Sequence, residues 1–283
     1  MTQMDRPLRS MLYIPGSRPR ALDKARGLAC DAIIFDLEDA VSPDEKEDAR
    51  KTLATALAEG GYGQRTKLVR VNGLDTVWGR DDIAAFAGAD IDGLLIPKVN
   101  GAADLDALSD SAPDQALWAM VETARGVMNA QQIADHPAMA GFVMGTNDLA
   151  KELGSRTRAA MLTSLQWSLL AARAAGIACI DGVYNAFKDE EGLRAECLEG
   201  RDLGFDGKTL IHPAQLAIAN ELFAPSEDEI ELAKRQIAAF EDAEAAGQGV
   251  AVVDGRIVEN LHVVTARSIL AKAEAIATLE GAA

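Results

Sequence analysis

The segment Ala32-Ile33-Ile34-Phe35-Asp36-Leu37-Glu38-Asp39 joins a short apolar run to three acids. Because the apolar residues follow one another without alternation, residues 32–37 are typical of a strand that is buried on both faces, as in a parallel sheet. Seven more runs of this kind occur along the chain: Met11–Ile14, Leu68–Val71, Gly93–Ile96, Leu117–Val121, Gly141–Met144, Ile177–Ile180 and Lys208–Ile211. The sequence therefore predicts eight buried strands.

Amphipathic stretches with recognisable ends lie between these runs. Ser42 and Pro43 are typical of a helix start, and residues 156–175 form another helical stretch that Gly176 would end. Strands that alternate with helices in this way predict a (β/α)8 barrel, the TIM-barrel class of α/β fold. An open doubly wound sheet is the alternative.

The pattern changes after the eighth unit. Ser226 and Glu229 form a capping box for a helix that runs to Ala246, and a final helix covers residues 263–280. Between them, an Asp254-Gly255 turn predicts a small hairpin. We expect a catalytic barrel domain over residues 1–225 and a helix-hairpin-helix appendage over residues 226–283. The appendage would act as a lid or in oligomerisation.

The 283 residues include 28 Lys and Arg against 44 Asp and Glu, which gives a net charge of −16. A surface this negative repels phosphate backbones and anionic lipid, which argues against nucleic-acid and membrane binding. No apolar stretch is suited to a signal peptide or a membrane span, so we expect a cytoplasmic enzyme. Cys30, Cys179 and Cys197 form no CxxC pair and are interpreted as packing residues.

Polar residues follow every predicted strand. In a barrel, the carboxyl ends of the strands and the loops after them build the active site. The acids expected at this rim are Asp36, Glu38, Asp39, Glu122, Asp148 and Asp181. Oxygen ligands without clustered His or Cys favour Mg²⁺ over zinc. Glu122 and Asp148 are the predicted ligands, and helix caps or ion-pair partners are the alternative interpretation of both.

Arg70 lies at the end of a predicted buried strand, where a guanidinium needs an anionic partner. A substrate carboxylate or an enolate oxygen would serve, because the planar fork of donors matches either. A structural salt bridge to Asp36 or Glu38 would serve equally well. The residues themselves leave both interpretations open.

Two further features give weaker signals. The turn Pro15-Gly16-Ser17-Arg18, with Lys24 nearby, offers backbone amides and cations to a phosphate. His212, which precedes a proline, is interpreted as a loop residue whose ring bonds a backbone carbonyl. The sequence has no GxSxG, GxGxxG or Walker pattern, which argues against a serine hydrolase, a dinucleotide site and an ATP site.

Several of these segments, taken together and in order, resemble the family of the citrate lyase β subunit and malyl-CoA lyases, within the HpcH/HpaI aldolase superfamily. The matching segments are Arg9–Gly16, Asp36–Val41, Val69–Gly73, Ile96–Val99, Val121–Thr123, Gly145–Ala150 and Ile211–Pro213. They span nearly the whole chain. The resemblance implies a (β/α)8 barrel and a homo-oligomer, commonly a trimer and otherwise a hexamer.

The resemblance also implies a site. Glu122 and Asp148 would hold Mg²⁺, or Mn²⁺ in its place, and Arg70 would bind the thioester or enolate oxygen. Glu38 and Asp39 would be further catalytic residues, which lie around these groups and orient them. The residues that would contact the CoA thioester are Tyr13, Arg18, Lys24 and Arg70, and we add Lys98 and His212 to this substrate-binding set.

One departure from the family pattern concerns the appendage. Family members carry a catalytic Asp in a motif like Gly-x-Met-Val-Asp, which protonates the enolate in a neighbouring subunit. Here the stretch reads Gly255-Arg256-Ile257-Val258-Glu259, so Glu259 takes the place of the acid with one extra methylene. A shift of about 1 Å in a proton donor can cost on the order of 100-fold in rate. Carbon-carbon cleavage would then be impaired or redirected.

Within the family, the pattern is most similar to malyl-CoA thioesterases. We therefore expect Mg²⁺-dependent hydrolysis of (3S)-malyl-CoA to malate and CoA, with Glu259 as a general acid or base. The first alternative is a lyase that cleaves malyl-CoA or citramalyl-CoA to glyoxylate or pyruvate plus an acyl-CoA. The second is a citrate-lyase-type subunit whose substrate is bound to an acyl carrier protein. A catalytically silent CoA-binding protein is the least favoured alternative.

Overall fold

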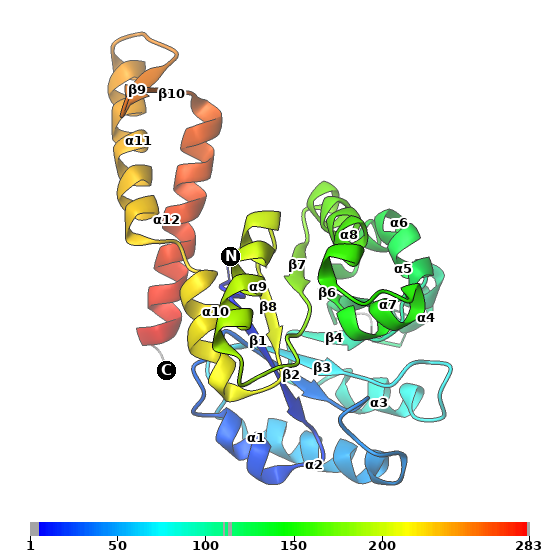
Figure 1. Ribbon diagram of the computed structural model, residues 1–283. Coiled ribbons are helices and arrows are strands. Elements are labelled where there is room, and N and C mark those ends of the chain that lie inside the picture. The colour runs from blue at the N-terminus through cyan, green and yellow to red at the C-terminus, as the bar shows by residue number, and fades with distance from the viewer. Residues whose placement is uncertain (1–5, 110, 113–114, 282–283) are drawn as a thin grey trace. The chain divides into compact units, whose positions relative to one another are not determined.

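The computed structural model describes residues 6–109, 111–112 and 115–281, and its centre is a closed barrel of parallel strands (Figure 1). The strands are β1 (Ser10–Pro15), β2 (Ala32–Asp36), β3 (Thr66–Arg70), β4 (Gly93–Ile96), β5 (Leu117–Val121), β6 (Met139–Met144), β7 (Ala178–Asp181) and β8 (Gly207–Leu210). Because β1 pairs with β8, the sheet has no open edge. The predicted barrel is therefore confirmed, and the open doubly wound sheet is wrong.

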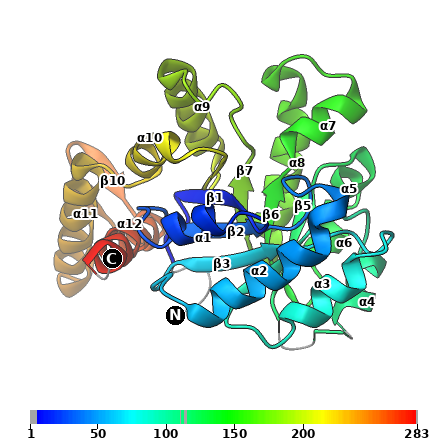
Figure 2. The same cartoon turned by 90° about the horizontal axis from the view of Figure 1, so that it is seen from below.

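Helices follow the strands and lie outside them (Figure 2). They are α1 (Pro19–Ala25), α2 (Lys46–Glu59), α3 (Gly79–Phe86), α4 (Ala103–Ser109), α5 (Ala124–Met128), α6 (Ala130–Ala134), α7 (Thr146–Leu153), α8 (Leu162–Ala175), α9 (Glu190–Leu203) and α10 (Leu216–Leu222). Three short 3₁₀ turns, η2 (Pro43–Glu45), η3 (Arg158–Met161) and η4 (Pro213–Gln215), precede α2, α8 and α10. The helix predicted over residues 156–175 is thus a 3₁₀ turn followed by α8, which ends at Gly176 in the left-handed conformation.

Two apolar clusters hold the barrel together. One fills its interior with residues from β1 to β7, among them Met11, Ile34, Leu68 and Met120. The other lies between the strands and the surrounding helices and contains their outward-facing residues. At the interior position of Gly141, any side chain would overlap the ring of the fully buried Trp118, so only glycine fits there.

The chain divides into two compact units, one of which covers Leu8–Phe223 and contains the barrel. The second covers residues 6–7 and 224–281 of the described chain and contains α11 (Glu227–Ala245), the antiparallel strands β9 (Ala251–Val253) and β10 (Arg256–Val258), and α12 (Asn260–Gly281). The predicted capping box forms, since Ser226 Oγ accepts the Glu229 amide and Glu229 Oε2 accepts the Ser226 amide. Asp254 and Gly255 turn the hairpin with φ of 50° and 75°.

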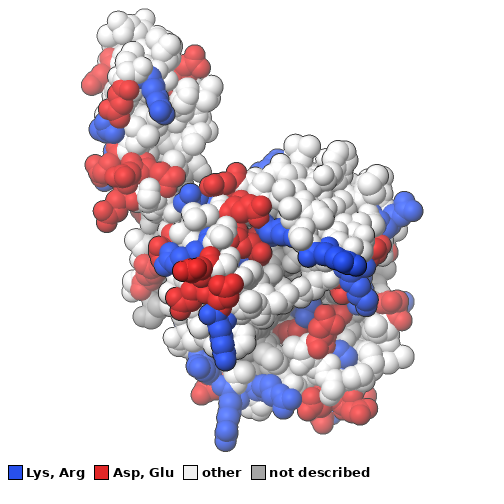
Figure 3. Space-filling model, viewed as in Figure 1, with Lys and Arg blue, Asp and Glu red and all other residues white. Residues whose placement is uncertain are grey.

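The surface carries charges of both signs, and the cysteines are buried. On the face in Figure 3, acidic and basic side chains lie interspersed. Cys30, Cys179 and Cys197 are all buried free thiols, as predicted for packing residues. None of the helices in the described part of the chain is both long and apolar enough to span a membrane.

Candidate active site

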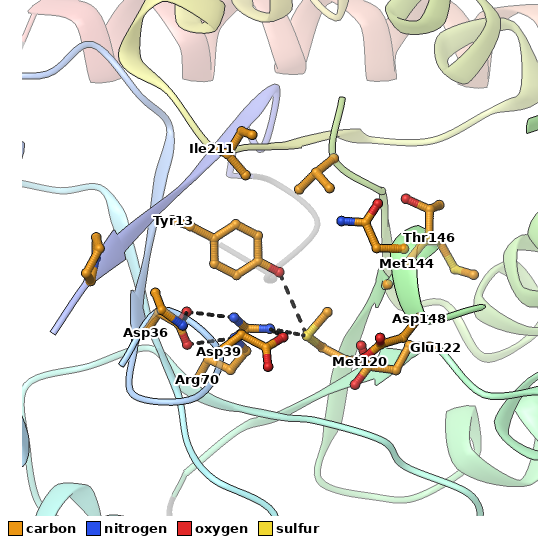
Figure 4. Close-up of a pocket in the computed structure, with 15 residues that line it drawn as sticks. Tyr13, Asp36, Asp39, Arg70, Met120, Glu122, Met144, Thr146, Asp148 and Ile211 are labelled. Carbon is orange, nitrogen blue, oxygen red and sulfur yellow. Dashed lines mark hydrogen bonds and ion pairs between the residues drawn. The ribbon is translucent and has the colours of Figure 1, made fainter. Parts of the chain in front are cut away.

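A pocket of about 360 Å³ opens where the barrel strands end (Figure 4). Its walls come from the carboxyl ends of the strands and the loops that follow, the usual place for the active site of this fold. The lining residues are Tyr13, Pro15, Asp36, Asp39, Ala40, Arg70, Met120, Glu122, Met144, Gly145, Thr146, Asn147, Asp148, Val183 and Ile211. The cavity is large enough for a short acyl group, and it places one cation, Arg70, among four carboxylates.

Arg70 forms a two-pronged salt bridge with Asp36 at one wall of this pocket. Its Nε and Nη2 atoms lie 2.7 and 2.6 Å from the two carboxylate oxygens of Asp36. The third nitrogen, Nη1, lies 3.1 Å from Glu38 Oε2 and 3.6 Å from Asp39 Oδ2. Burial lowers the pKa of the Arg70 guanidinium, but the neighbouring acidic groups, Asp36 first and Glu38 after it, together raise the pKa above its ordinary value. The predicted salt bridge is present, and Arg70 lines the pocket as well.

Tyr13 covers the guanidinium from the side of β1. The Cζ atom of Arg70 lies 4.9 Å from the centre of the Tyr13 ring, within the range of a cation–π contact. The Tyr13 hydroxyl is directed at the sulfur of Met120, 3.8 Å away. Burial raises the pKa of the phenol, so Tyr13 stays neutral at physiological pH. The ring therefore restricts the movement of Arg70 without adding charge to the pocket.

Glu122 and Asp148 face the pocket from β5 and α7. Glu122 is buried, and one of its oxygens, Oε1, accepts the Lys98 amide at 2.8 Å. Burial is the main reason why the pKa of Glu122 rises to about 7. Asp148 lies in the first turn of α7, where the helix dipole favours a negative charge. Within the described residues, neither carboxylate forms an ion pair.

This pair of carboxylates suits a hard divalent cation. Mg²⁺ in proteins takes one or two carboxylates and completes its shell with water and substrate oxygens. Among the described residues there is no group of three or more His, Cys, Asp and Glu that could bind a metal. A side chain at Gly145 would overlap the carboxylate of Glu122, so glycine leaves the room that this carboxylate needs.

Lys98 lies beside the pocket rather than in its wall. Its φ of 54° is in the left-handed region, which a residue with a side chain rarely adopts. This conformation directs the Lys98 amide at Glu122, while the ammonium lies 3.4 Å from Glu38 Oε1. Lys98 therefore contacts two of the acids that were predicted from the sequence, Glu122 through its backbone and Glu38 through its side chain.

Asp181 was expected in the same cavity, and this expectation is wrong. Its carboxylate is fully buried on the outer side of β7, 2.8 Å from the ammonium of Lys208 and 2.9 Å from the guanidinium of Arg158. The interior residue of this strand end is Ile180, and successive side chains of a strand point to opposite faces. Asp181 therefore points away from the pocket.

Other predicted site residues lie outside the pocket wall. Arg18 and Lys24 are exposed at the start and near the end of α1. His212 caps η4, because its Nδ1 atom accepts the Ala214 amide at 3.1 Å, and its ring stacks on Phe187. The ring thus bonds a backbone amide, and the predicted bond to a carbonyl is wrong.

Glu259 belongs to the second compact unit. It is exposed and immediately precedes α12. Its backbone amide donates to His262 Nδ1 at 3.0 Å, which closes the turn before the helix.

The sequence analysis overlooked several residues around the site. Met120 contacts both Tyr13 and Arg70, and Thr146 lines the pocket beside Gly145. The buried Gln215 accepts the amides of Ile211 and His212 and donates to the Tyr184 carbonyl. Met120 could have been found as the residue two positions before Glu122. No sequence signal marks Gln215.

Comparison with known proteins agrees with this architecture. A (3S)-malyl-CoA thioesterase of Cereibacter sphaeroides is 67% identical over 280 residues, which cover 98% of each chain. An L-malyl-CoA/beta-methylmalyl-CoA lyase of the same species is 35% identical and covers 96% of each chain.

A solved structure gives a similar result. The CitE protein of Mycobacterium tuberculosis, in complex with magnesium, acetoacetate and coenzyme A, superposes with a TM-score of 0.79 at 29% identity, covering 94% of this chain and 97% of that chain. The sequence profile of HpcH/HpaI aldolase/citrate lyase matches residues 9–213, the barrel. The chain therefore belongs to the HpcH/HpaI aldolase/citrate lyase family.

Proposed function

We propose that this protein is a Mg²⁺-dependent thioesterase that hydrolyses (3S)-malyl-CoA to malate and CoA. The observation that carries the proposal is the arrangement of the pocket, in which two carboxylates that form no ion pair with any described residue share a cavity with one fixed guanidinium. The similarity to a thioesterase along nearly the whole chain supports the choice of reaction.

Glu122 and Asp148 would hold the Mg²⁺ ion, with Mn²⁺ as the alternative. When bound, the ion supplies a Lewis acid that polarises the substrate oxygens it contacts. The Nη1 atom of Arg70 would donate to the thioester oxygen as negative charge develops there. Asp36 accepts hydrogen bonds from the other two guanidinium nitrogens, Nε and Nη2, and so holds Arg70 in place. Glu38 and Asp39 would keep Nη1 directed at this position.

Hydrolysis needs a water molecule and a proton for the departing thiol. The water oxygen bonds to the thioester carbon, the carbon–sulfur bond breaks, and the CoA sulfur takes up a proton. The pocket holds only a short acyl group, so the rest of the CoA lies outside it. Arg18 and Lys24, which are exposed and have no ion-pair partner in the described chain, would bind its phosphates. Tyr13, Lys98 and His212 complete the proposed substrate contacts.

We assign Glu259 the role of general acid or base in a neighbouring copy, with residues 1–225 as the catalytic domain and 226–283 as the lid and oligomerisation appendage. The appendage exposes large apolar side chains on both sides of Glu259: Val252, Ile257, Leu261 and Val264. Exposed apolar clusters of this kind mark protein–protein contacts. We therefore propose a homo-oligomer, a trimer or hexamer, and a cytoplasmic location that keeps the three thiols reduced.

Product analysis tests the reaction. The purified protein is incubated with (3S)-malyl-CoA and Mg²⁺, and the products are separated by chromatography. Malate with free CoA is the expected result. Acetyl-CoA with glyoxylate would overturn the thioesterase and support the lyase activity named for the 35% identical relative. Turnover of the free CoA thioester also argues against a subunit that needs a carrier-bound substrate.

Two variants test the metal site. Replacement of Glu122 by Ala should abolish metal-dependent turnover, because it removes a carboxylate that faces the pocket. Glu47 is an exposed acid on α2 and serves as the control, since Glu47→Ala should keep wild-type activity. Metal-dependent turnover by the Glu122→Ala variant would exclude the proposed site.

A further inference from the structure

A cluster of buried charges lies on the outer side of β7 and β8, away from the pocket. Lys208 and Asp181 have no exposed surface, and their charged atoms lie 2.8 Å apart. Lys208 also lies 2.7 Å from Glu196, and Arg158 bonds Asp181 and Glu199. Removing ions from water is costly, so hydrophobic residues of similar volume would often stabilise a fold equally well. The proposed chemistry does not use any of these groups.

This cluster contacts the backbone at the end of β7. The strand ends at Asp181, so the backbone carbonyl groups from this residue onward need hydrogen-bond donors from outside the strand ladder. Side chains of β8 and η4 provide the donors: Thr209 Oγ1 to Asp181 O at 3.0 Å, Lys208 Nζ to Gly182 O at 2.6 Å, and Gln215 Nε2 to Tyr184 O at 2.9 Å. Asp181 Oδ1 accepts the Gly182 amide at 2.8 Å. The Gly182 residue is therefore held at both its amide and its carbonyl.

Gly182 in turn packs against the end of β6. A Cβ atom at this position would overlap the side chain of Thr146 and lie 2.8 Å from the Met144 carbonyl. Gly145, which directly precedes Thr146, packs equally closely against Glu122, because a Cβ atom at Gly145 would overlap the Glu122 carboxylate. Two close glycine contacts thus link the buried charges to the segment Gly145–Asp148 and to Glu122. Close-packed interiors transmit such displacements because they contain few voids.

We propose that Lys208 is a positioning residue, which fixes the Gly182 peptide and through it the two carboxylates that face the pocket. The inference rests on the proposed function, because it assigns these carboxylates to Mg²⁺. Lys208 touches neither substrate nor metal in this arrangement. Its effect is on the geometry of Glu122 and Asp148, and so on the affinity for the ion.

The test is the dissociation constant of Mg²⁺, measured by calorimetry on the full chain without substrate. Partners that orient metal ligands typically change affinity roughly 10- to 100-fold when they are replaced. We expect a loss of that size for Lys208→Met, and partial recovery for Lys208→Arg, which keeps the charge. Gly182→Ala should give a similar loss without altering any charge, because its methyl group displaces Thr146. This second variant keeps the test valid if Lys208→Met does not fold.

A matched control lies at the opposite end of the strands. Arg9 and Asp31, which directly precede β1 and β2, form a buried salt bridge of 2.8 Å. Asp31→Asn should lower the melting temperature and leave the Mg²⁺ dissociation constant unchanged.

Each outcome separates the two proposals. A wild-type protein that does not bind Mg²⁺ overturns the proposed function. Wild-type binding together with unchanged affinity in Lys208→Met and Gly182→Ala overturns the role of Lys208. An equal loss of affinity in Asp31→Asn would also overturn it, because the effect would then be one of general stability.

Discussion

Replacing Asp36 by Asn tests whether the salt bridge holds Arg70 in its working position. The wild-type carboxylate accepts from Nε at 2.7 Å and from Nη2 at 2.6 Å. Asparagine has nearly the same shape but only one acceptor oxygen, and its amide nitrogen is a donor. One of the two bonds is therefore lost, a donor faces a donor, and the negative charge closest to the guanidinium disappears.

The loss of stability expected for Asp36→Asn follows from the burial of the Arg70–Asp36 pair. Removing one partner of a buried ion pair destabilises a protein by about 3–5 kcal/mol. Glu38 stays 3.1 Å from Nη1 and compensates in part, so we expect the lower end, about 3 kcal/mol. In a unit of roughly 150–250 residues, 1 kcal/mol corresponds to about 2–4 °C, which gives a fall in melting temperature of about 6–12 °C. Displacement of the guanidinium should lower kcat by on the order of 100-fold.

Differential scanning calorimetry and steady-state kinetics measure the two effects. The control is Glu221→Gln, since Arg194 and Glu221 form a two-pronged pair of similar length that is largely exposed. Exposed pairs contribute about 0–1 kcal/mol, so this variant should stay within about 4 °C of the wild type and keep its activity. An Asp36→Asn protein with wild-type melting temperature and kcat would refute the role given to this salt bridge.

Four further predictions concern the carboxylates. Burial raises the pKa of Glu122 to about 7, so calorimetric titration should show Mg²⁺ affinity falling about tenfold per pH unit below pH 7 and levelling off above it; a flat profile would contradict this. By the same shift, the folded metal-free protein keeps a proton on Glu122 that the unfolded chain has released, which lowers stability as the pH rises from 4.5 to about 7. Gly145→Ala should weaken Mg²⁺ binding at least about tenfold, because its methyl group meets the Glu122 carboxylate, and unchanged affinity would count against that ligand. Glu259→Asp should lower the kcat for malate formation by about 100-fold with little change in KM, and a wild-type kcat would remove Glu259 from the reaction.

The strands were predictable because burial on both faces produces apolar runs, and these runs are too short for a buried helix. Their ends were less so. Thr66 and Lys67 belong to β3 although they are polar, because they pair with Ala32 and Ile33 of β2. In the other direction, Leu37 and Val71 were predicted to continue their strands but follow the ends of β2 and β3. Pairing between distant segments decides such residues, and the local pattern does not contain it.

The candidate site was predictable in part. Glu122, Asp148 and Arg70 lie together at the predicted rim, since strand ends in a barrel converge wherever they occur in the sequence. The sequence could not decide between a salt bridge and a pocket residue for Arg70, because the answer depends on which nitrogens Asp36 occupies. The left-handed backbone of Lys98 has no local signal either, since lysine is not a residue that favours it.

Alternate side chains of a strand point into the barrel and away from it. Which set of alternate positions points inward, here called the phase of the strand, decides which polar residues share the pocket. Tyr13, Asp36, Arg70 and Glu122 each come two positions after an interior residue, namely Met11, Ile34, Leu68 and Met120. Asp181 comes one position after the interior residue Ile180, so the same alternation directs it outward. Runs that are apolar on both faces hide this phase, because every position in them is apolar.

The phase of β7 is fixed instead by charge. Asp181 and Lys208 are direct neighbours in the parallel pairing of β7 with β8. A shift of β7 by one residue would turn Asp181 into the pocket, where its charge would be added to those of Glu122 and Asp148. The same shift would take this carboxylate from the fully buried ammonium of Lys208 and leave it Glu196, and removing one partner of a buried ion pair costs about 3–5 kcal/mol. The buried Asp181–Lys208 pair therefore favours the register of β7 that keeps the carboxylate of Asp181 out of the pocket.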